Sequence, residues 1–273
     1  MSKGYEKPTI NKIDFAMASK YGSPIKSQKV RTKIDGVNVN ELTQKYGSPL
    51  FVFSQKTIEE KYNTLNDAFS SRYPDVKFSW SYKTNYLNEI CKIYHKLGSS
   101  AEVVSEFEYQ KARANGVEGK DIIFNGPYKP KADLKIAVQE GAKIHIDNLF
   151  ELNDLEEIAT ELNIKIPVAI RINMDTGTYP AWSRFGFNYE NGEAFETVKR
   201  MYDNGKLDLV GIHSHIGTFM LDANAYKMAT TKIMQLKSQV EQSFNCNIEY
   251  IDLGGGFASK SNLKGIYQSA EVV

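Results

Sequence analysis

Three segments of the chain carry residues whose chemistry is complementary. Lys83 ends the strand-like run Phe78–Lys83 and offers an amine that can condense with an aldehyde. Far downstream, His213–Thr218 (HSHIGT) offers flat imidazole rings, and Asp252–Gly256 (DLGGG) offers three successive glycines. Glycines leave backbone N–H groups unobstructed, so such a turn can bind a phosphate. An amine, a flat ring partner and a phosphate nest are what pyridoxal phosphate requires, and the combination predicts that cofactor.

The sequence between these segments predicts the sheet that would position them. After about residue 50, short apolar segments alternate with longer helical patterns, which is typical of parallel β/α units. Strands are expected near Val76–Lys83, Ser99–Val104, Asp121–Asn125, Lys143–Asp147, Pro167–Asn173, Leu209–His215 and Ile248–Leu253. Helices are expected at Thr57–Arg72, Leu87–Leu97, Ser105–Asn115, Lys131–Glu140 and Leu149–Leu162.

Alternation of side chains within these strands indicates one apolar face and one polar face. In one strand, Ile170 and Ile172 alternate with Arg171 and Asn173. An apolar outer face under helices and a polar inner face are typical of a (β/α)₈ TIM-type barrel, whose ligand site lies at the carboxyl ends of the strands. Such a barrel needs eight strands, and seven are visible. Either one strand is missed or, as we expect, the last strand lies outside this chain.

The first 48 residues do not follow the β/α alternation. Lys33–Val39 is expected to form a strand with a turn at Asp35-Gly36, and Asn40–Tyr46 a short helix. We therefore expect residues 1–48 to form an N-terminal arm, or part of a β-domain, and residues 49–273 to form the cofactor-binding barrel without a C-terminal β-domain.

Composition narrows the class of protein. The chain has 273 residues, with 34 basic and 33 acidic side chains, so no nucleic-acid or membrane-surface partner is expected. Its two cysteines, Cys91 and Cys246, match no disulfide framework and no metal-ligand spacing, and no metal site is expected. No apolar leader and no apolar run long enough for a membrane helix are visible, which predicts a cytoplasmic protein.

Five motifs together resemble the fold-type III pyridoxal-phosphate enzymes, the alanine-racemase-like barrels. Trp80–Asn85 (WSYKTN) is similar to the family pattern YAxKAN, Ala101–Ser105 (AEVVS) to FDVVS, and Ser183–Gly186 (SRFG) to SKFG. His213–Thr218 is similar to HxHIGS, and Asp252–Gly256 matches DLGGG. The five occur in family order and resemble in particular the diaminopimelate, ornithine and arginine decarboxylase branch.

The resemblance implies roles for the motif residues. Lys83 would hold the cofactor as a Schiff base, and His215 would stack on the pyridine ring. The phosphate would be bound by Thr218, Gly254, Gly255 and Gly256.

The resemblance leaves other inward-facing residues less defined. Glu102 stands where the family usually has aspartate and is expected among the cofactor-binding residues. Arg171 would lie near the phenolic oxygen of the cofactor or help to arrange the lumen. His213 is open between a site role and a structural one. His145 and Asp147 would either line the pocket or form a structural salt-linked pair.

The resemblance also implies an activity. We expect a pyridoxal-phosphate-dependent carboxy-lyase of amino-acid metabolism, acting through Lys83 on a basic or dicarboxylic amino acid and assembling as a homodimer. Racemisation or elimination on the same fold, or a catalytically incomplete cofactor-binding subunit, remain alternatives. The family's Glu-Pro-Gly-Arg segment, which supplies the acid at the pyridine nitrogen, is not found after the glycine run, so this chain alone is expected to be incomplete.

Overall fold

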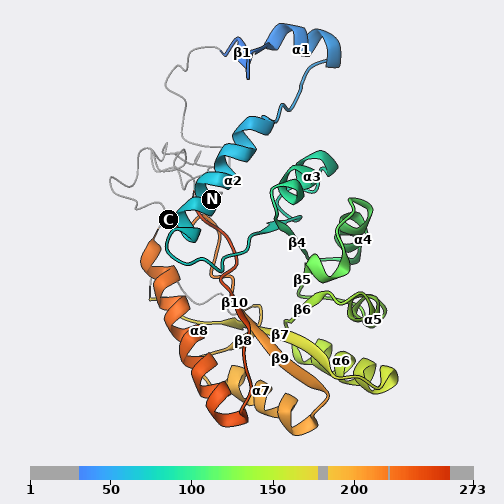
Figure 1. The fold of residues 1–273 in the computed structure, drawn as a ribbon, viewed down its shortest axis with the longest axis vertical. Coiled ribbons are helices and arrows are strands. Elements are labelled where there is room, and N and C mark those ends of the chain that lie inside the picture. Colours follow the sequence, from blue (N-terminus) through green and yellow to red (C-terminus); the bar gives the residue numbers. More distant parts are fainter. Residues whose placement is uncertain (1–30, 178–183, 221, 259–273) are drawn as a thin grey trace, which may run out of the picture.

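The computed structural model describes residues 31–177, 184–220 and 222–258. Its centre is a curled sheet of parallel strands that follow one another across the sheet in chain order (Figure 1). The strands on this path are β3 (Ser79–Ser81), β4 (Ser100–Val103), β5 (Ile122–Phe124), β6 (Lys143–Ile146), β7 (Ile166–Asn173), β9 (Leu207–His213) and β10 (Tyr250–Asp252). Because all run in one direction, their carboxyl ends meet at one edge of the sheet.

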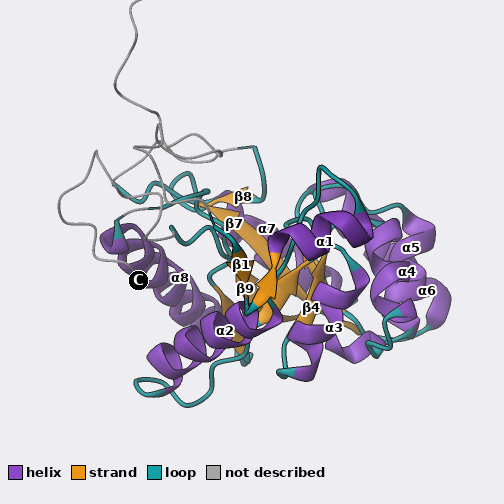
Figure 2. Ribbon diagram, turned by 90° about the horizontal axis from the view of Figure 1, so that it is seen from above, coloured by secondary structure: helices purple, strands orange, loops and turns teal. Residues whose placement is uncertain are grey.

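Helices surround the outside of the curled sheet, as Figures 1 and 2 show. They are α2 (Gln55–Ser70), α3 (Asn88–Lys96), α4 (Glu106–Ala114), α5 (Lys131–Gln139), α6 (Leu149–Leu162), α7 (Glu193–Asn204) and α8 (Ala223–Phe244), with a 3₁₀ turn at Gly119–Asp121. From α3 onward, the helices lie in the connections between successive parallel strands of the sheet, as crossovers between parallel strands require, whereas α2 precedes β3.

Polar residues just after β4 and β6 cap the N-termini of the helices that follow these strands. Ser105 follows β4, and its hydroxyl accepts the N–H of Glu108 at 3.3 Å. Asn148 follows β6, and its side-chain oxygen accepts the N–H groups of Phe150 and Glu151 at 3.1 and 3.2 Å. These contacts satisfy backbone donors that the first turn of a helix leaves without partners.

The core lies between the outer face of the sheet and the helices. Strand residues in it include Ile144, Ile146, Val168, Ile170 and Ile172, and helix residues include Leu152, Leu155 and Ile158. The alternate strand residues His145, Arg171, Asn173 and His213 are buried polar groups. The predicted alternation of an apolar outer face and a polar inner face is therefore confirmed.

The predicted α/β architecture, a TIM-type barrel without its last strand, is also confirmed. In the described part of the chain, β3 and β10 are the two ends of the strand path and do not pair with each other. Strand β3 is shorter than the predicted range Val76–Lys83. It ends at Ser81, so Lys83 lies in the turn that follows. A short strand, β8 (Phe187–Asn188), pairs with β7 and was not predicted. The helices α7 and α8 also lie outside the predicted ranges.

The N-terminal part of the described chain lies apart from the sheet, at the top of Figure 1. It consists of a hairpin, β1 (Lys33–Ile34) and β2 (Val37–Asn38), followed by α1 (Val39–Tyr46). The expected turn at Asp35-Gly36 and the short helix are therefore present. The division into domains at residue 48 stays a prediction. Among the described residues, no helix is both long enough and apolar enough to cross a membrane.

Candidate functional site

Lys83 lies at the carboxyl edge of the sheet, two residues beyond the end of β3. The turn that carries it is closed by a hydrogen bond from Thr84 N–H to Ser81 O at 3.0 Å. Its Nζ lies 3.0 and 3.2 Å from the two carboxylate oxygens of Glu102 on β4. The Lys83 side chain is 45% exposed and that of Glu102 only 10%. The amine is thus held by a nearly buried carboxylate and remains open to an incoming molecule.

Tyr82 fixes the direction in which Lys83 points. The Tyr82 ring is fully buried on the helix side of the sheet, and its hydroxyl lies 2.9 Å from His95 Nε2 on α3. Asn115 donates a second hydrogen bond to the same hydroxyl at 3.3 Å. Because successive side chains near a strand end point to opposite faces, anchoring Tyr82 outward directs Lys83 toward the lumen.

A chain of polar contacts runs from Glu102 across the lumen. Asn125, directly after β5, lies with Nδ2 3.4 Å from Glu102 Oε1 and 3.0 Å from His213 Nε2. His213 Nδ1 lies 3.2 Å from Asp252 Oδ2 at the end of β10. Gly254 N–H donates to Asp252 Oδ1 at 2.7 Å. Four strand ends are therefore connected from the amine to the glycine turn.

The sequence reasoning gave no role to Asn125 and treated Asp252 only as part of a motif. Both are the last polar residue of a predicted strand, and that position was the available signal. What sequence could not show is the partner of each, because the contacts join strands separated by 88 positions in the case of Asn125 and His213.

His215 lies between the lysine and the glycine turn. Gly255 N–H donates to its Nδ1 at 3.4 Å, and a Cβ atom placed on Gly254 would approach the same nitrogen to 2.9 Å. Burial, followed by the positive charge of Lys83, lowers the pKa of His215 to about 4. The ring is therefore neutral near neutral pH and suits contact with an aromatic ring.

The glycine turn is tightly fitted at two positions and open at the third. Gly254 and Gly256 have φ angles of 66° and 86°, and a Cβ atom on Gly256 would lie 2.0 Å from Gly217 O. A Cβ atom on Gly255 would meet no atom within 4 Å. Thr218 follows Gly217 and is exposed beside this turn. Open space next to a glycine backbone is the feature that a phosphate nest needs.

Arg171 is buried in the lumen, as its position on the inner face predicts. Its guanidinium donates to Asp147 Oδ1 at 3.1 Å and lies over the ring of Phe185, 4.7 Å from the centroid. Asp147 thus has an ion-pair partner, but that partner is Arg171 and not His145. The Ser183 part of the SRFG motif lies outside the described residues.

A buried ion pair that was not predicted holds two strand ends together. Lys129 Nζ donates to Glu151 Oε2 at 2.7 Å, to His145 O at 3.0 Å and to Gly126 O. Glu151 Oε2 also accepts the N–H of Asp147 at 2.9 Å. This pair fixes the segments that follow β5 and β6, which carry lumen residues. A lysine in a Gly-Pro-rich loop gives no sign of such burial in the sequence.

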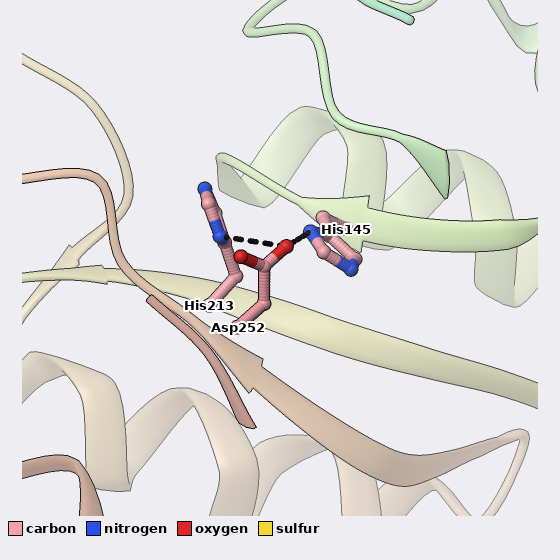
Figure 3. A group of neighbouring side chains, drawn as sticks. All are labelled: His145, His213 and Asp252. Atoms are coloured by element: carbon pink, nitrogen blue, oxygen red, sulfur yellow. Dashed lines mark ion pairs between the residues drawn. The ribbon is translucent and has the colours of Figure 1, made fainter. Parts of the chain in front are cut away.

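His145 completes the lumen floor. Its Nε2 lies 3.2 Å from the hydroxyl of Tyr250, and its Nδ1 lies 3.8 Å from Asp252 Oδ2. Figure 3 shows His145 and His213 on either side of the Asp252 carboxylate. Burial, followed by the neighbouring His213, lowers the pKa of His145 to about 3.

The lowered pKa values of His145 and His215 predict that the fold loses stability in acid. With pKa values of about 3 and about 4 when folded and 6.5 as the ordinary value, His145 and His215 bind fewer protons in the folded state. Stability that is present above about pH 6.5 is therefore lost as the pH falls toward 4. Lowering the pH from about 7 to about 5 should reduce the free energy of unfolding by up to about 2 kcal/mol for each histidine. Urea unfolding at several pH values measures this loss.

The variant His145→Gln isolates the contribution of His145 to the pH dependence of stability. Its free energy of unfolding should depend less on pH than that of the wild type over the same range. Equal pH dependence in the two proteins would remove His145 as a source of the effect.

The residues present fit pyridoxal phosphate. An accessible amine, a neutral imidazole and a glycine turn with open space at Gly255 lie on neighbouring strand ends. Lys83 and His215 would face the pyridine ring, and the turn at Gly255 would receive the phosphate. These roles, and those of Glu102, Arg171 and Thr218, remain predictions.

Comparison with known proteins places the chain in a family. Residues 55–271 match the family described as "Pyridoxal-dependent decarboxylase, pyridoxal binding domain". The chain is 32% identical over 236 residues to the diaminopimelate decarboxylase of Aquifex aeolicus, covering 83% of this chain and 54% of that protein. It is similar to the crystal structure of the Methanocaldococcus jannaschii diaminopimelate decarboxylase, with a TM-score of 0.77 and 31% identity.

That likeness extends over 84% of this chain and 55% of the solved one, and a second structure of the same enzyme holds L-lysine. The chain therefore spans about half the length of the relatives that it matches. Both the family match and the level of identity lead to one assignment: the chain belongs to the pyridoxal-dependent decarboxylase family and contains its pyridoxal-binding domain.

Proposed function

We propose that the protein is a pyridoxal-phosphate-dependent decarboxylase of a diamino dicarboxylic acid of the diaminopimelate type. The observation that supports this best is the position of Lys83 Nζ, 3.0 Å from Glu102 and on the strand ends next to His215 and the glycine turn. The names of the relatives supply the substrate class. L-Lysine, held by one neighbour, is what remains when diaminopimelate loses one carboxylate.

The cofactor, when bound, supplies an electron sink that lets an α-carboxylate leave as carbon dioxide. The chain's own residues prepare for this. Glu102 accepts a hydrogen bond from Lys83 Nζ and holds the amine at the mouth of the lumen. His215 presents a neutral ring face, and Arg171 brings N–H donors to the inner surface. Gly255 leaves room for a phosphate between its backbone and solvent.

Two further features belong to the proposal. We expect the protein to assemble as a homodimer, as the family resemblance implies, and to act in the cytoplasm.

The test uses the protein isolated from its native source, loaded with pyridoxal phosphate and given carboxyl-labelled diaminopimelate. Release of labelled carbon dioxide is the expected result. Loss of α-deuterium from the substrate without carbon dioxide would instead favour racemisation or elimination. Cofactor binding with no turnover of any amino acid would favour a catalytically incomplete subunit.

A further inference from the structure

Three side chains converge on one point in the floor of the lumen (Figure 3). They are His145 on β6, His213 on β9 and Asp252 on β10, and their ligand atoms lie within 4.8 Å of one another. Both histidine rings are at least 99% buried. Their Nδ1 atoms both approach the same oxygen, Asp252 Oδ2, at 3.2 and 3.8 Å.

The Asp252 carboxylate differs from the other carboxylates around the lumen in having no lysine or arginine partner among the described residues. Among the described residues of the lumen, three cations each have a carboxylate partner within 3.1 Å. These pairs are Lys83 with Glu102, Arg171 with Asp147 and Lys129 with Glu151. Asp252 instead lies against two histidine rings, which carry a positive charge only when protonated. A carboxylate removed from water requires a compensating positive charge.

We propose that His145, His213 and Asp252 bind one divalent transition-metal ion, with zinc as the best match to the donor set. Two imidazole nitrogens and one carboxylate oxygen are typical ligands of such ions, and a fourth position would face the lumen for water. Zinc binds nitrogen at about 2.1 Å, so tetrahedral ligand atoms lie about 3.4 Å apart. The 3.2 Å distance already meets this value. The 3.8 Å distance requires a shift of about 0.4 Å, and the two histidine nitrogens, which lie within 4.8 Å of each other, require a shift of at most about 1.4 Å.

The groups behind the ligands are suited to this role. His145 Nε2 can donate its proton to Tyr250 Oη at 3.2 Å, which leaves Nδ1 free for the metal. Asp252 Oδ1 accepts the Gly254 N–H, which leaves Oδ2 as the ligand. Asn125 Oδ1 is buried without a partner, and rotation of its amide would let this oxygen accept a hydrogen bond from His213 Nε2 in exchange for the 3.4 Å contact of Nδ2 with Glu102.

The site is reached from the lumen. The Asp252 side chain is 23% exposed, whereas the histidine rings are covered. An ion would therefore enter over Asp252, beside the glycine turn. This proposal does not depend on the decarboxylase activity, because it concerns only the chain's own side chains. It departs from the sequence-based expectation of no metal site, since the three ligands come from strands far apart in the sequence.

The test is a Co²⁺ titration of the full chain without tag or pyridoxal phosphate, followed by its visible absorption bands. Zinc retained after gel filtration gives the stoichiometry. We expect one ion for each chain, with bands that indicate nitrogen and oxygen ligands. Asp252→Asn and His145→Ala should each weaken binding by at least roughly tenfold. Asparagine keeps an oxygen for the Gly254 N–H, so Asp252→Asn should preserve the turn.

His95→Gln is the matched control. His95 is one of the chain's four histidines, is partly buried and lies on α3 against Tyr82, outside the cluster. The control should bind Co²⁺ as the wild type does. A wild-type chain that folds, by circular dichroism, but binds no ion would overturn the proposal. So would binding that is unchanged in Asp252→Asn and His145→Ala.

Discussion

Replacement of Lys83 by alanine should abolish covalent attachment of pyridoxal phosphate to the protein. In the wild type, borohydride reduction after incubation with the cofactor should fix a pyridoxyl group on the peptide that contains Lys83. The reason is the position of Nζ at the lumen mouth, where Glu102 accepts a hydrogen bond from the amine and the lysine side chain stays 45% exposed. Peptide mapping by mass spectrometry measures the label, which should fall to background in Lys83→Ala.

Two variants separate bond formation from charge. Lys83→Arg keeps a positive charge beside Glu102 but has no amine that can form an imine, so it should also lack the label. Lys92→Ala removes a half-exposed lysine that pairs with Glu89 on α3, and it should keep the full label. A wild-type label on a lysine other than Lys83 would refute the assignment.

The sequence predicted the sheet well because its information is local. Alternation such as Ile170 and Ile172 with Arg171 and Asn173 sets the face of each side chain, whatever the tertiary structure. The same rule placed Lys83 and Arg171 in the lumen. The predicted end of β3 was wrong, because the strand stops at Ser81 and the chain then turns. This turn depends on the anchoring of Tyr82 by residues of other elements, which alternation does not show.

Partners of the lumen residues could not be predicted in the same way. The sequence shows that Asp147 and Arg171 face inward, but their pairing depends on the register between β6 and β7. The burial of Lys129 depends on the path of the segment after β5. Register and loop path are set by packing across the whole sheet, so these contacts became visible only in the folded chain.

The second large predicted effect is on stability and concerns the glycine turn. Substitution of Gly256 should destabilise the protein, whereas the same substitution at the neighbouring Gly255 should be tolerated. Gly256→Ala should lower the free energy of unfolding by about 2–4 kcal/mol. Its φ of 86° disfavours a side chain, and the new Cβ atom would lie 2.0 Å from Gly217 O, a backbone atom that cannot move alone. Gly255→Ala should stay within about 0.5 kcal/mol of the wild type, because nothing lies within 4 Å of its Cβ position. Urea unfolding of both variants measures the difference.

A negative charge introduced at Gly255 tests whether the cofactor phosphate binds at the glycine turn. Gly255→Asp should leave the fold intact, because the space around Gly255 is open, yet weaken pyridoxal phosphate binding by roughly 100-fold. That factor corresponds to a carboxylate about 6 Å from a single negative charge at an effective dielectric constant of about 20, so it is a lower bound for a phosphate that carries more than one charge. Fluorescence titration with the cofactor gives the dissociation constants, and Gly255→Asn provides the uncharged control of similar size. If the aspartate and asparagine variants bind the cofactor equally well, the phosphate does not lie at this turn.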